Sequence, residues 1–207
     1  DNLTIDAGLV SPLGSIGNFV WKDANDNGIQ DNGELGVDGV TIKLWSASQS
    51  GNPVTELEST TTANGGGYSF TELAAGEYIV QVMISTLPND CQLSDKANQG
   101  ADDTKDNDFN STNGLSPVVT LNPTNGGLDK DNPTIDVGLK STLGSIGNFV
   151  WQDTDDNGVQ DINEVGVQNV SMLLWSADGS GNKISILKTA TTSSQGYYNF
   201  TDLAAGR

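Results

Sequence analysis

The sequence predicts an all-β chain built from tandem antiparallel β-sandwich repeats. First, its apolar residues come in short runs separated by Gly, Asn, Asp, Thr and Ser, which is typical of strands joined by turns. Second, no stretch keeps the helical period for long, and no apolar run reaches the roughly 18 residues of a membrane-spanning helix. Third, the sequence repeats itself, and such a repeat divides a chain into similar units.

The repeat has an offset of 130 residues. Residues Asp1–Trp21 recur as Asp131–Trp151, and the correspondence continues without a gap until Gly206, which matches Gly76. The chain therefore contains one full period and part of the next.

Domain boundaries are expected within the period. The segment Ile5–Leu9 resembles a closing strand, and a very short linker follows it before the next unit opens. We expect residues 1–12 to end a preceding domain, residues 13–141 to form a complete domain, and residues 142–207 to begin a third. A sandwich cut within a sheet leaves unpaired edges, so we expect the natural polypeptide to continue on both sides.

Short strands are expected throughout the complete period, because apolar and β-branched runs alternate there with turn-forming residues. In order, the candidates are Ser15–Trp21, Val37–Trp45, Val54–Thr60, Tyr68–Phe70, Glu77–Ile84, Pro117–Leu121 and Thr134–Leu139. Within the second candidate, Val40, Ile42 and Leu44 alternate with polar neighbours, which turns one face of the strand to a core. About seven short strands joined by turn-rich loops favour a two-sheet antiparallel sandwich.

The charge and the missing residue types exclude several classes of function. Acidic residues number 27 against 9 basic ones, which argues against binding to nucleic acid or to anionic lipid and calls for bound cations. The chain has no histidine and one cysteine, Cys91, so Ser-His-Asp and Cys-His catalysis, the usual zinc sites and an internal disulfide are excluded. We expect that the protein is not an enzyme.

A twelve-residue segment matches the calcium-loop pattern D-x-[DN]-x-[DN]-G-x5-E at every defined position. Calcium takes six to eight oxygen ligands, and this spacing wraps carboxylate, amide and carbonyl oxygens around one ion. The expected ligands are the side chains of Asp23, Asn25, Asn27, Asp31 (directly or through water) and Glu34, and the main-chain carbonyl of Ile29. Gly28 permits the sharp turn at position 6.

The loop recurs one period later. The corresponding ligands are Asp153, Asp155, Asn157, the carbonyl of Val159, Asp161 and Glu164. Three other positions differ between the copies, namely Ala24/Thr154, Asn32/Ile162 and Gly33/Asn163, whereas the ligand positions keep an oxygen donor. An acidic, solvated hairpin loop is the alternative, but it would not need that restriction. Since the flanks resemble strands, we expect EF-hand-like calcium loops that connect β-strands.

A second acidic cluster lies in the long segment Pro88–Gly114, which has no clear strand pattern. A loop of this length is uncommon in a compact domain unless something organises it. Its candidate ligands for one or more further calcium ions are Asp106 and Asp108, with or without Asp102, Asp103 and Asp136 of the closing strand. A mobile, solvated loop is the alternative.

These motifs together resemble the B repeats of the staphylococcal serine-aspartate repeat (Sdr) surface adhesins, which are SdrD B-like, Cna-B-type domains. The matching elements are G-x-[FY]-V-W-x-D-x-[DN]-x-[DN]-G-x-Q-D at Gly17–Asp31, the segment Tyr68–Tyr78, Asp106-Asn107-Asp108 and Asp136–Leu139. The resemblance implies a prealbumin-type sandwich with several structural calcium ions. The family usually has Ser where this chain has Asn107.

The resemblance also implies a function, namely a calcium-stiffened structural spacer or fibre repeat of a large extracellular or cell-surface protein. The alternative is an adhesin repeat that binds carbohydrate or protein directly through the Pro88–Gly114 loop. Expected partners are neighbouring repeats of the same chain, with lateral or head-to-tail self-association in a fibre. Neither nucleic acid nor direct membrane insertion is expected.

Overall fold

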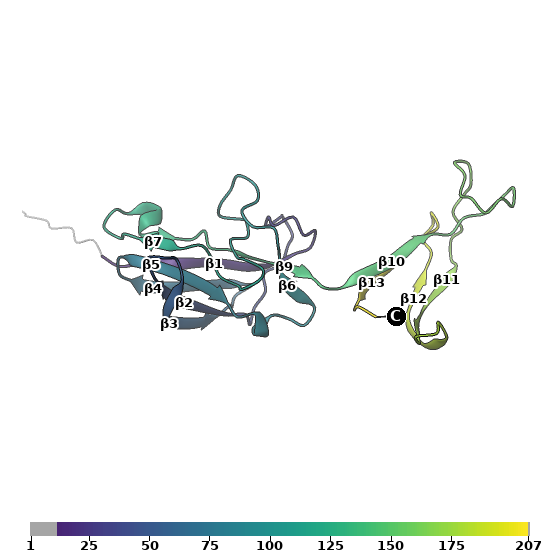
Figure 1. Ribbon diagram of the computed structural model, residues 1–207. Helices are drawn as coiled ribbons and strands as arrows, with labels where there is room; N and C mark the ends of the chain where they lie inside the picture. Colours follow the sequence, from purple (N-terminus) through teal and green to yellow (C-terminus); the bar gives the residue numbers. More distant parts are fainter. Residues whose placement is uncertain (1–11, 207) are drawn as a thin grey trace, which may run out of the picture. The chain divides into compact units, whose positions relative to one another are not determined.

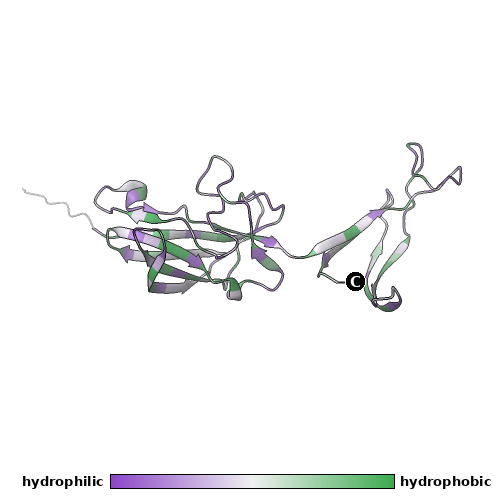
Figure 2. Ribbon diagram, in the orientation of Figure 1, coloured by the Kyte–Doolittle hydropathy of each residue, from purple (hydrophilic) through white to green (hydrophobic). Residues whose placement is uncertain are grey.

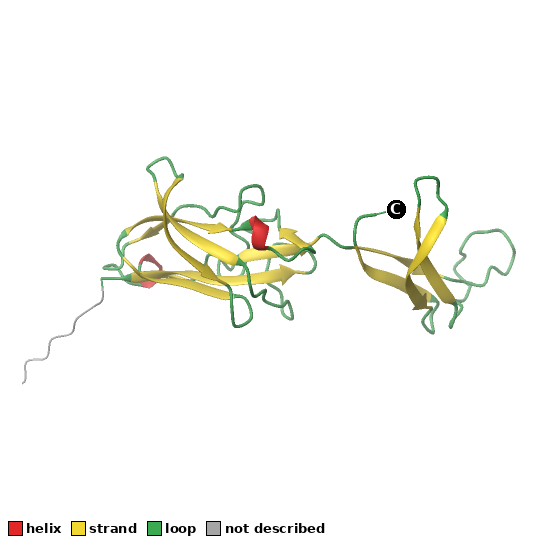
Figure 3. Cartoon of the chain, turned by 90° about the horizontal axis from the view of Figure 1, so that it is seen from below, coloured by secondary structure: helices red, strands yellow, loops and turns green. Residues whose placement is uncertain are grey.

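The fold is all-β, as predicted. The structure is a computed structural model that describes residues 12–206, and its elements are strands and two short 3-10 helices (Figures 1 and 3). The chain divides into two compact units after Ser141. Each unit is described by itself.

The first unit is a sandwich of two sheets. Its elements are β1 (Gly14–Asp23), β2 (Thr41–Ala47), β3 (Pro53–Thr61), β4 (Gly67–Leu73), β5 (Gly76–Val82), η1 (Ile84–Thr86), β6 (Cys91–Leu93), β7 (Val119–Leu121), η2 (Gly127–Asp129), β8 (Asp131–Asn132) and β9 (Val137–Ser141). One sheet has the order β4-β1-β9-β6, with β8 paired to β1, and the other has the order β3-β2-β5-β7.

Every strand expected within residues 13–141 overlaps an observed one, and two short strands were missed. The closing strand expected at Ile5–Leu9 lies outside the described residues. β2 begins at Thr41 and not at Val37, because the chain turns at Gly39, which has φ of 85°. The missed strands are β6 and β8, which have only three and two residues. Strands this short leave no alternation in the sequence to detect.

The pairing of β1 with β9 differs from the expected antiparallel sandwich. These two strands run parallel, with Val20 opposite Val137 and Asp23 opposite Lys140. The strand that closes the unit thus enters the sheet beside the strand that opens it. Sequence periodicity reports which face of a strand is buried but not the direction of its neighbour.

The core lies between the two sheets and consists of the inward side chains of both. Ile16 and Phe70 in one sheet, and Ile42 and Leu44 in the other, are completely buried. Hydrophobic residues are concentrated along these strands, and the loops are mostly hydrophilic (Figure 2). Cys91 is partly buried against the core, as a small apolar residue would be.

The second unit has two antiparallel strand pairs. They are β10 (Gly144–Phe149) with β13 (Tyr197–Leu203), and β11 (Ser171–Ala177) with β12 (Lys183–Thr191). The register of the first pair repeats that of β1 with β4, including the irregularity after the first residue. In this unit Ile146 is 55% exposed, where its counterpart Ile16 in the first unit is fully buried.

Candidate metal centre

The first candidate loop is a tight connection that leaves the end of β1. Its base is closed by backbone hydrogen bonds from the Lys22 N–H to the Leu35 carbonyl (2.8 Å) and from the Val37 N–H to the Val20 carbonyl (2.8 Å). Residues 23–34 therefore project from a sheet and not from a helix, as their flanks predicted.

Asp23 and Glu34, at the first and last positions of this loop, hold its backbone from opposite ends. The Asp23 carboxylate accepts from the Gly28 N–H (2.8 Å) and the Asn27 N–H (3.1 Å). The Glu34 carboxylate accepts from the Ala24 N–H (2.7 Å) and the Asp31 N–H (3.0 Å). Gly28 has φ of 78°, the left-handed conformation that glycine adopts without steric cost.

Two asparagine side chains of the loop turn toward Asp31. The Asn25 and Asn27 amides both donate to one oxygen of Asp31, at 2.8 and 2.9 Å. Positions 3 and 5 of the loop are thus tied to position 9 through the amide nitrogens of these two asparagines. Ile29 is aligned by its N–H, which donates to the Asn27 side-chain oxygen (2.7 Å).

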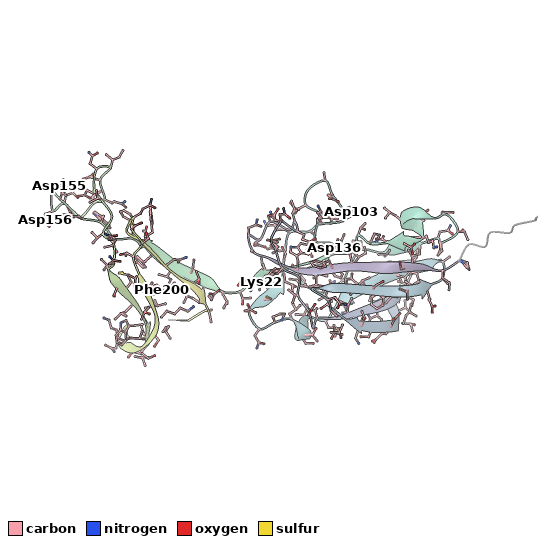
Figure 4. The ribbon with its side chains drawn as sticks, turned by 180° about the vertical axis from the view of Figure 1, so that it is seen from behind. Lys22, Asp103, Asp136, Asp155, Asp156 and Phe200 are labelled. Atoms are coloured by element: carbon pink, nitrogen blue, oxygen red, sulfur yellow. The ribbon has the colours of Figure 1, made fainter. Side chains whose placement is uncertain are left out.

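The second loop has the same internal arrangement. The Asp153 carboxylate accepts from the Gly158 N–H (2.8 Å), and the Glu164 carboxylate accepts from the N–H groups of Thr154 (2.6 Å) and Asp161 (3.0 Å). One ligand oxygen each of Asp153, Asp155 and Glu164 lies within 4.8 Å of the other two, close enough to share a metal ion. Figure 4 shows Asp155 on this protruding loop. The Val159 N–H donates to Asn157 (2.6 Å), as Ile29 does to Asn27.

The two loops differ in their surroundings. The first loop is docked against the long acidic segment, because the Gly28 carbonyl accepts from the Asn107 N–H (3.1 Å) and the Gln30 N–H donates to the Lys105 carbonyl (2.6 Å). A Cβ added to Gly28 would lie 2.3 Å from the Lys96 carbonyl oxygen, whereas one added to Gly158 would meet no atom of residues 12–206 within 4 Å.

A second acidic centre lies where this segment meets β9. Asp106, Asp108 and Asp136 are 4%, 8% and 0% exposed. Asp108 accepts from the Asp136 N–H (2.7 Å), and Asp136 accepts from the Asn18 amide (2.9 Å). One oxygen of Asp106 and one of Asp136 are buried without a hydrogen-bond partner among the residues that the structure describes.

Burial shifts the acidity of these carboxyl groups. Loss of solvent raises the pKa of Asp108 to about 7 and that of Asp136 to about 8, and it also raises the pKa of Asp106. The neighbouring carboxylates add to each shift by repulsion. Buried, unpartnered carboxylate oxygens are costly unless a cation or a proton neutralises them. The centre therefore has the chemistry of a site for a hard cation.

The other two acidic candidates of this segment lie outside the buried centre. Asp102 is exposed and accepts from the Thr104 hydroxyl (2.6 Å), and Lys105 lies 3.7 Å from it. Asp103 is exposed, and Figure 4 labels it apart from Asp136. Of the five acids grouped by the sequence, the fold thus buries only three together.

Sequence reasoning missed two polar residues of this centre. Asn18 supplies the hydrogen bond to Asp136, and the side-chain oxygen of the fully buried Asn107 accepts from the Gly138 N–H (3.2 Å). The position of Asn107 between two candidate ligands was a usable signal. Asn18 carried none, because it lies 118 residues from its partner.

The comparison with protein families decides the identity of this fold. The model of the SdrD B-like domain matches the chain twice, at residues 14–139 and 144–207. The chain belongs to the SdrD B-like domain family. The resemblance inferred from the loop motifs is therefore confirmed.

Curated relatives of this SdrD B-like chain are serine-aspartate repeat-containing proteins. Protein D of Staphylococcus aureus (strain Newman) is 36% identical over 207 residues, which are all of this chain and 14% of the relative. Protein F of Staphylococcus epidermidis (strain ATCC 12228 / FDA PCI 1200) is 38% identical over the same 207 residues, or 11% of its length. The chain thus spans only a small part of each relative.

Among solved structures, a streptococcal ancillary pilin aligns with 95% of this chain and 52% of its own length, at 13% identity and a TM-score of 0.40. In the part of the chain that the structure describes, no helix is long and apolar enough to cross a membrane. Membership of the SdrD B-like family assigns the chain to the cell surface.

Proposed function

We propose that this SdrD B-like chain is part of a row of tandem repeats that acts as a calcium-stiffened spacer in a cell-surface protein. In this proposal residues 13–141 form one whole repeat, residues 1–12 end the one before, and residues 142–207 begin the next. The spacer's partners are its neighbouring repeats, and it has no catalytic role. Self-association in a fibre belongs to the same proposal.

The observation that carries the calcium assignment is the same ligand arrangement in two loops 130 residues apart. Both loops hold their first carboxylate on the glycine N–H at 2.8 Å and their last carboxylate on two backbone N–H groups. In the second loop, oxygens of Asp153, Asp155 and Glu164 also lie within 4.8 Å of one another, which suits an ion that prefers oxygen ligands.

The buried centre supports a further calcium ion. Asp106 and Asp108 lie in the long segment and Asp136 directly precedes β9, and their carboxyl groups repel one another in a dry environment. A divalent cation there would convert this repulsion into a link between the long segment and β9. It would also use the two buried oxygens that have no partner.

Calcium bound to the folded state alone would stabilise each repeat by RT ln(1 + [Ca²⁺]/Kd), or about 2.7 kcal/mol per site at a hundredfold excess over Kd. Typical domains have roughly 5 to 15 kcal/mol of stability. Two or three sites would thus supply a large part of the total and would hold the loops of the repeat in one conformation.

The direct test is calcium titration of the whole chain by calorimetry, together with the fluorescence of Trp21, which is buried two residues before Asp23. We expect saturable binding with Kd of about 10⁻³ M or tighter. Magnesium is the control, since its smaller, strictly octahedral shell fits such loops poorly. Absence of binding up to about 10 mM calcium would refute the proposal.

A chelator tests the stiffening. We expect its addition to make the chain more flexible in small-angle scattering and to expose the Pro88–Gly114 loop to protease first, because Asp106 and Asp108 lose the ion that anchors it. Identical scattering profiles and digestion patterns with and without chelator would mean that packing alone sets the rigidity.

Direct ligand binding is the second candidate, and the exposure of residues 98–105 favours it. These residues form the tip of the long loop, outside the buried centre. Replacing them with a Gly/Ser segment should leave calcium binding intact in either case. Loss of attachment to a carbohydrate or protein surface would assign an adhesive role to the tip, and unchanged attachment would leave the spacer alone.

A further inference from the structure

The first candidate calcium loop contains a peptide bond with unusual chemical lability. Asn-Gly steps rearrange when the glycine nitrogen attacks the preceding side-chain amide, and the chain has six of them, at Asn27, Asn32, Asn64, Asn113, Asn125 and Asn157. The nucleophile is the backbone nitrogen, so an acceptor that binds its N–H both fixes its position and opposes its deprotonation. The hydrogen bonds of the glycine therefore separate protected from unprotected steps.

Four of the six steps are protected in this way. The N–H groups of Gly28 and Gly158 donate to Asp23 and Asp153, each at 2.8 Å. The Gly65 N–H donates to a third carboxylate, that of Asp38 (2.9 Å), and the Gly114 N–H donates to a backbone carbonyl (2.8 Å). A neighbouring carboxylate disfavours the amide anion by charge repulsion.

The step Asn32-Gly33 lacks each of these restraints. Among the described residues, neither the Asn32 side chain nor the Gly33 N–H has a hydrogen-bond partner. Both residues are exposed, Gly33 has φ of 100°, and a Cβ built on it would find no atom within 4 Å. The nitrogen and the amide carbon are therefore free to approach one another in water.

The other open step is partly restrained. The Gly126 N–H likewise has no acceptor among the described residues, but the Asn125 amide donates to the Asp129 carboxylate at 2.9 Å. This bond turns the side chain of Asn125 toward Asp129 and raises the cost of the attack. Asn32 is thus the most reactive of the six.

We propose that Asn32-Gly33 is a site of spontaneous deamidation, and that its isoaspartate product disables the first calcium loop. The Gly33 nitrogen bonds to the Asn32 amide carbon and gives up its proton, and the side-chain nitrogen leaves as ammonia. Water then opens the cyclic imide at one of its two carbonyls. The products are aspartate and isoaspartate. Overall, one side-chain amide and one water become one carboxylate and one ammonium ion, and neither an oxidant nor an enzyme is needed.

The consequence for calcium rests on the function proposed above. Isoaspartate carries the main chain through the side-chain carbon, which adds one methylene to the backbone between Asp31 and Glu34. That stretch is closed by the Glu34 N–H on the Asp31 carbonyl (3.1 Å) and by the Asp31 N–H on the Glu34 carboxylate (3.0 Å). A longer backbone cannot keep both bonds, so the last ligand moves out of place. The second loop has Ile162 and Asn163 at these positions and is spared.

The test is timed incubation of the whole chain at mildly alkaline pH, followed by peptide mass spectrometry that separates aspartate from isoaspartate. We expect conversion at Asn32 first, at Asn125 later, and at Asn27 and Asn157 last. Asn32→Ile, which copies the second loop, should abolish the early conversion. Asn32→Gln serves the same purpose should the isoleucine variant fail to fold. Conversion of Asn27 or Asn157 as fast as Asn32 would overturn the assignment.

A second measurement separates the modification from its consequence. Calcium binding is measured on fresh and aged wild-type chain, with aged Asn32→Ile as the control. Loss of one calcium site in the aged wild type, but not in aged Asn32→Ile, supports both the deamidation and its effect on calcium binding. If Asn32 is converted but calcium binding is unchanged, the modification does not disable the loop, and calcium binding by this loop is contradicted as well. If Asn32 stays intact, the deamidation proposal is refuted and the calcium proposal is unaffected.

Discussion

Lys140, in the last strand of the first unit, places its ammonium group 3.5 Å from the carboxylate of Asp26 in the first candidate loop. The same group lies 3.1 Å from Asp95 and 17% of the Lys140 side chain is exposed. Contact with these two carboxylates raises the pKa of Lys140. One cation therefore connects the loop at the end of β1, the segment after β6 and the strand that leads to Ser141.

Removal of the positive charge of Lys140 should raise the calcium affinity of the first loop. Asp26 is not a candidate ligand, so Lys140→Met removes a positive charge near the site without removing a ligand. A unit charge and a divalent ion roughly 10 Å apart in water interact by roughly 0.8 kcal/mol, so we expect affinity to rise about twofold to fivefold at low salt. The control is Lys43→Met, whose partner is Glu56 at 2.7 Å on another sheet. Equal effects of the two variants on calcium titration would contradict the expectation.

The last ligand of the first loop should matter more than the third. Glu34→Gln removes a charge and one of two oxygens that close the loop, whereas Asn25→Ala removes one neutral oxygen. We expect a loss of calcium affinity of at least about tenfold for Glu34→Gln, or 1.4 kcal/mol, and a smaller loss for Asn25→Ala. Calorimetry on both variants measures this. Similar losses would show that Glu34 does not bind the ion.

The docking of the first loop can be measured with a pair of matched glycines. Gly28 and Gly158 have nearly equal φ, 78° and 75°, so alanine strains both backbones by about 1 to 2 kcal/mol. Only Gly28→Ala also meets the Lys96 carbonyl, at 2.3 Å, which should add about 1 to 3 kcal/mol. Denaturant unfolding of the two variants gives the difference. Equal losses of stability in the two variants would mean that the segment containing Lys96 moves aside without a measurable cost in free energy.

Acidification should stabilise the chain when calcium is absent. The folded-state pKa values of Asp108 and Asp136, about 7 and about 8, lie above the ordinary value of 3.8, so the folded state binds more protons than the unfolded state between these limits. Stability is then greatest below the ordinary pKa and is lost as pH rises through the raised values. We expect a gain of at least about 1 kcal/mol in chelator between pH 8 and pH 5.

The control for this pH dependence is Asp136→Asn, which keeps an oxygen for the Asn18 amide but has no proton to bind. Its slope of stability against pH should be smaller than that of the wild type. With calcium in excess, the wild type should show the opposite trend, because protons compete with the ion. A parallel pH profile of the two proteins in chelator would show that the buried carboxyl groups do not govern it.

The sequence predicts the local features of this molecule well and its long-range pairings poorly. The turn at Gly28 and the alternation of Val40, Ile42 and Leu44 follow from the chain itself, because neighbours a few residues apart decide them. The parallel pairing of β1 with β9 joins strands that are far apart in the sequence, and the hydrophobic periodicity of a strand does not indicate which strand pairs with it.

The same limit holds for the candidate site. The loop ligands at fixed spacing were recognisable, but the burial that distinguishes Asp106 and Asp108 from Asp102 and Asp103 depends on how the long segment packs. Spacing favoured Asp106 and Asp108 but left open whether Asp102 and Asp103 join them.

The parallel ladder between β1 and β9 determines how the first unit bears tension. β1 begins at Gly14, and β9 ends at Ser141 beside the far end of β1, so a pull on these two residues draws neighbouring strands past one another along their length. The hydrogen bonds of such a ladder are loaded in shear and must break together, whereas a hairpin pulled from its open end separates one bond at a time. A unit joined in series through these two strands would thus resist forces that unzip an antiparallel pair.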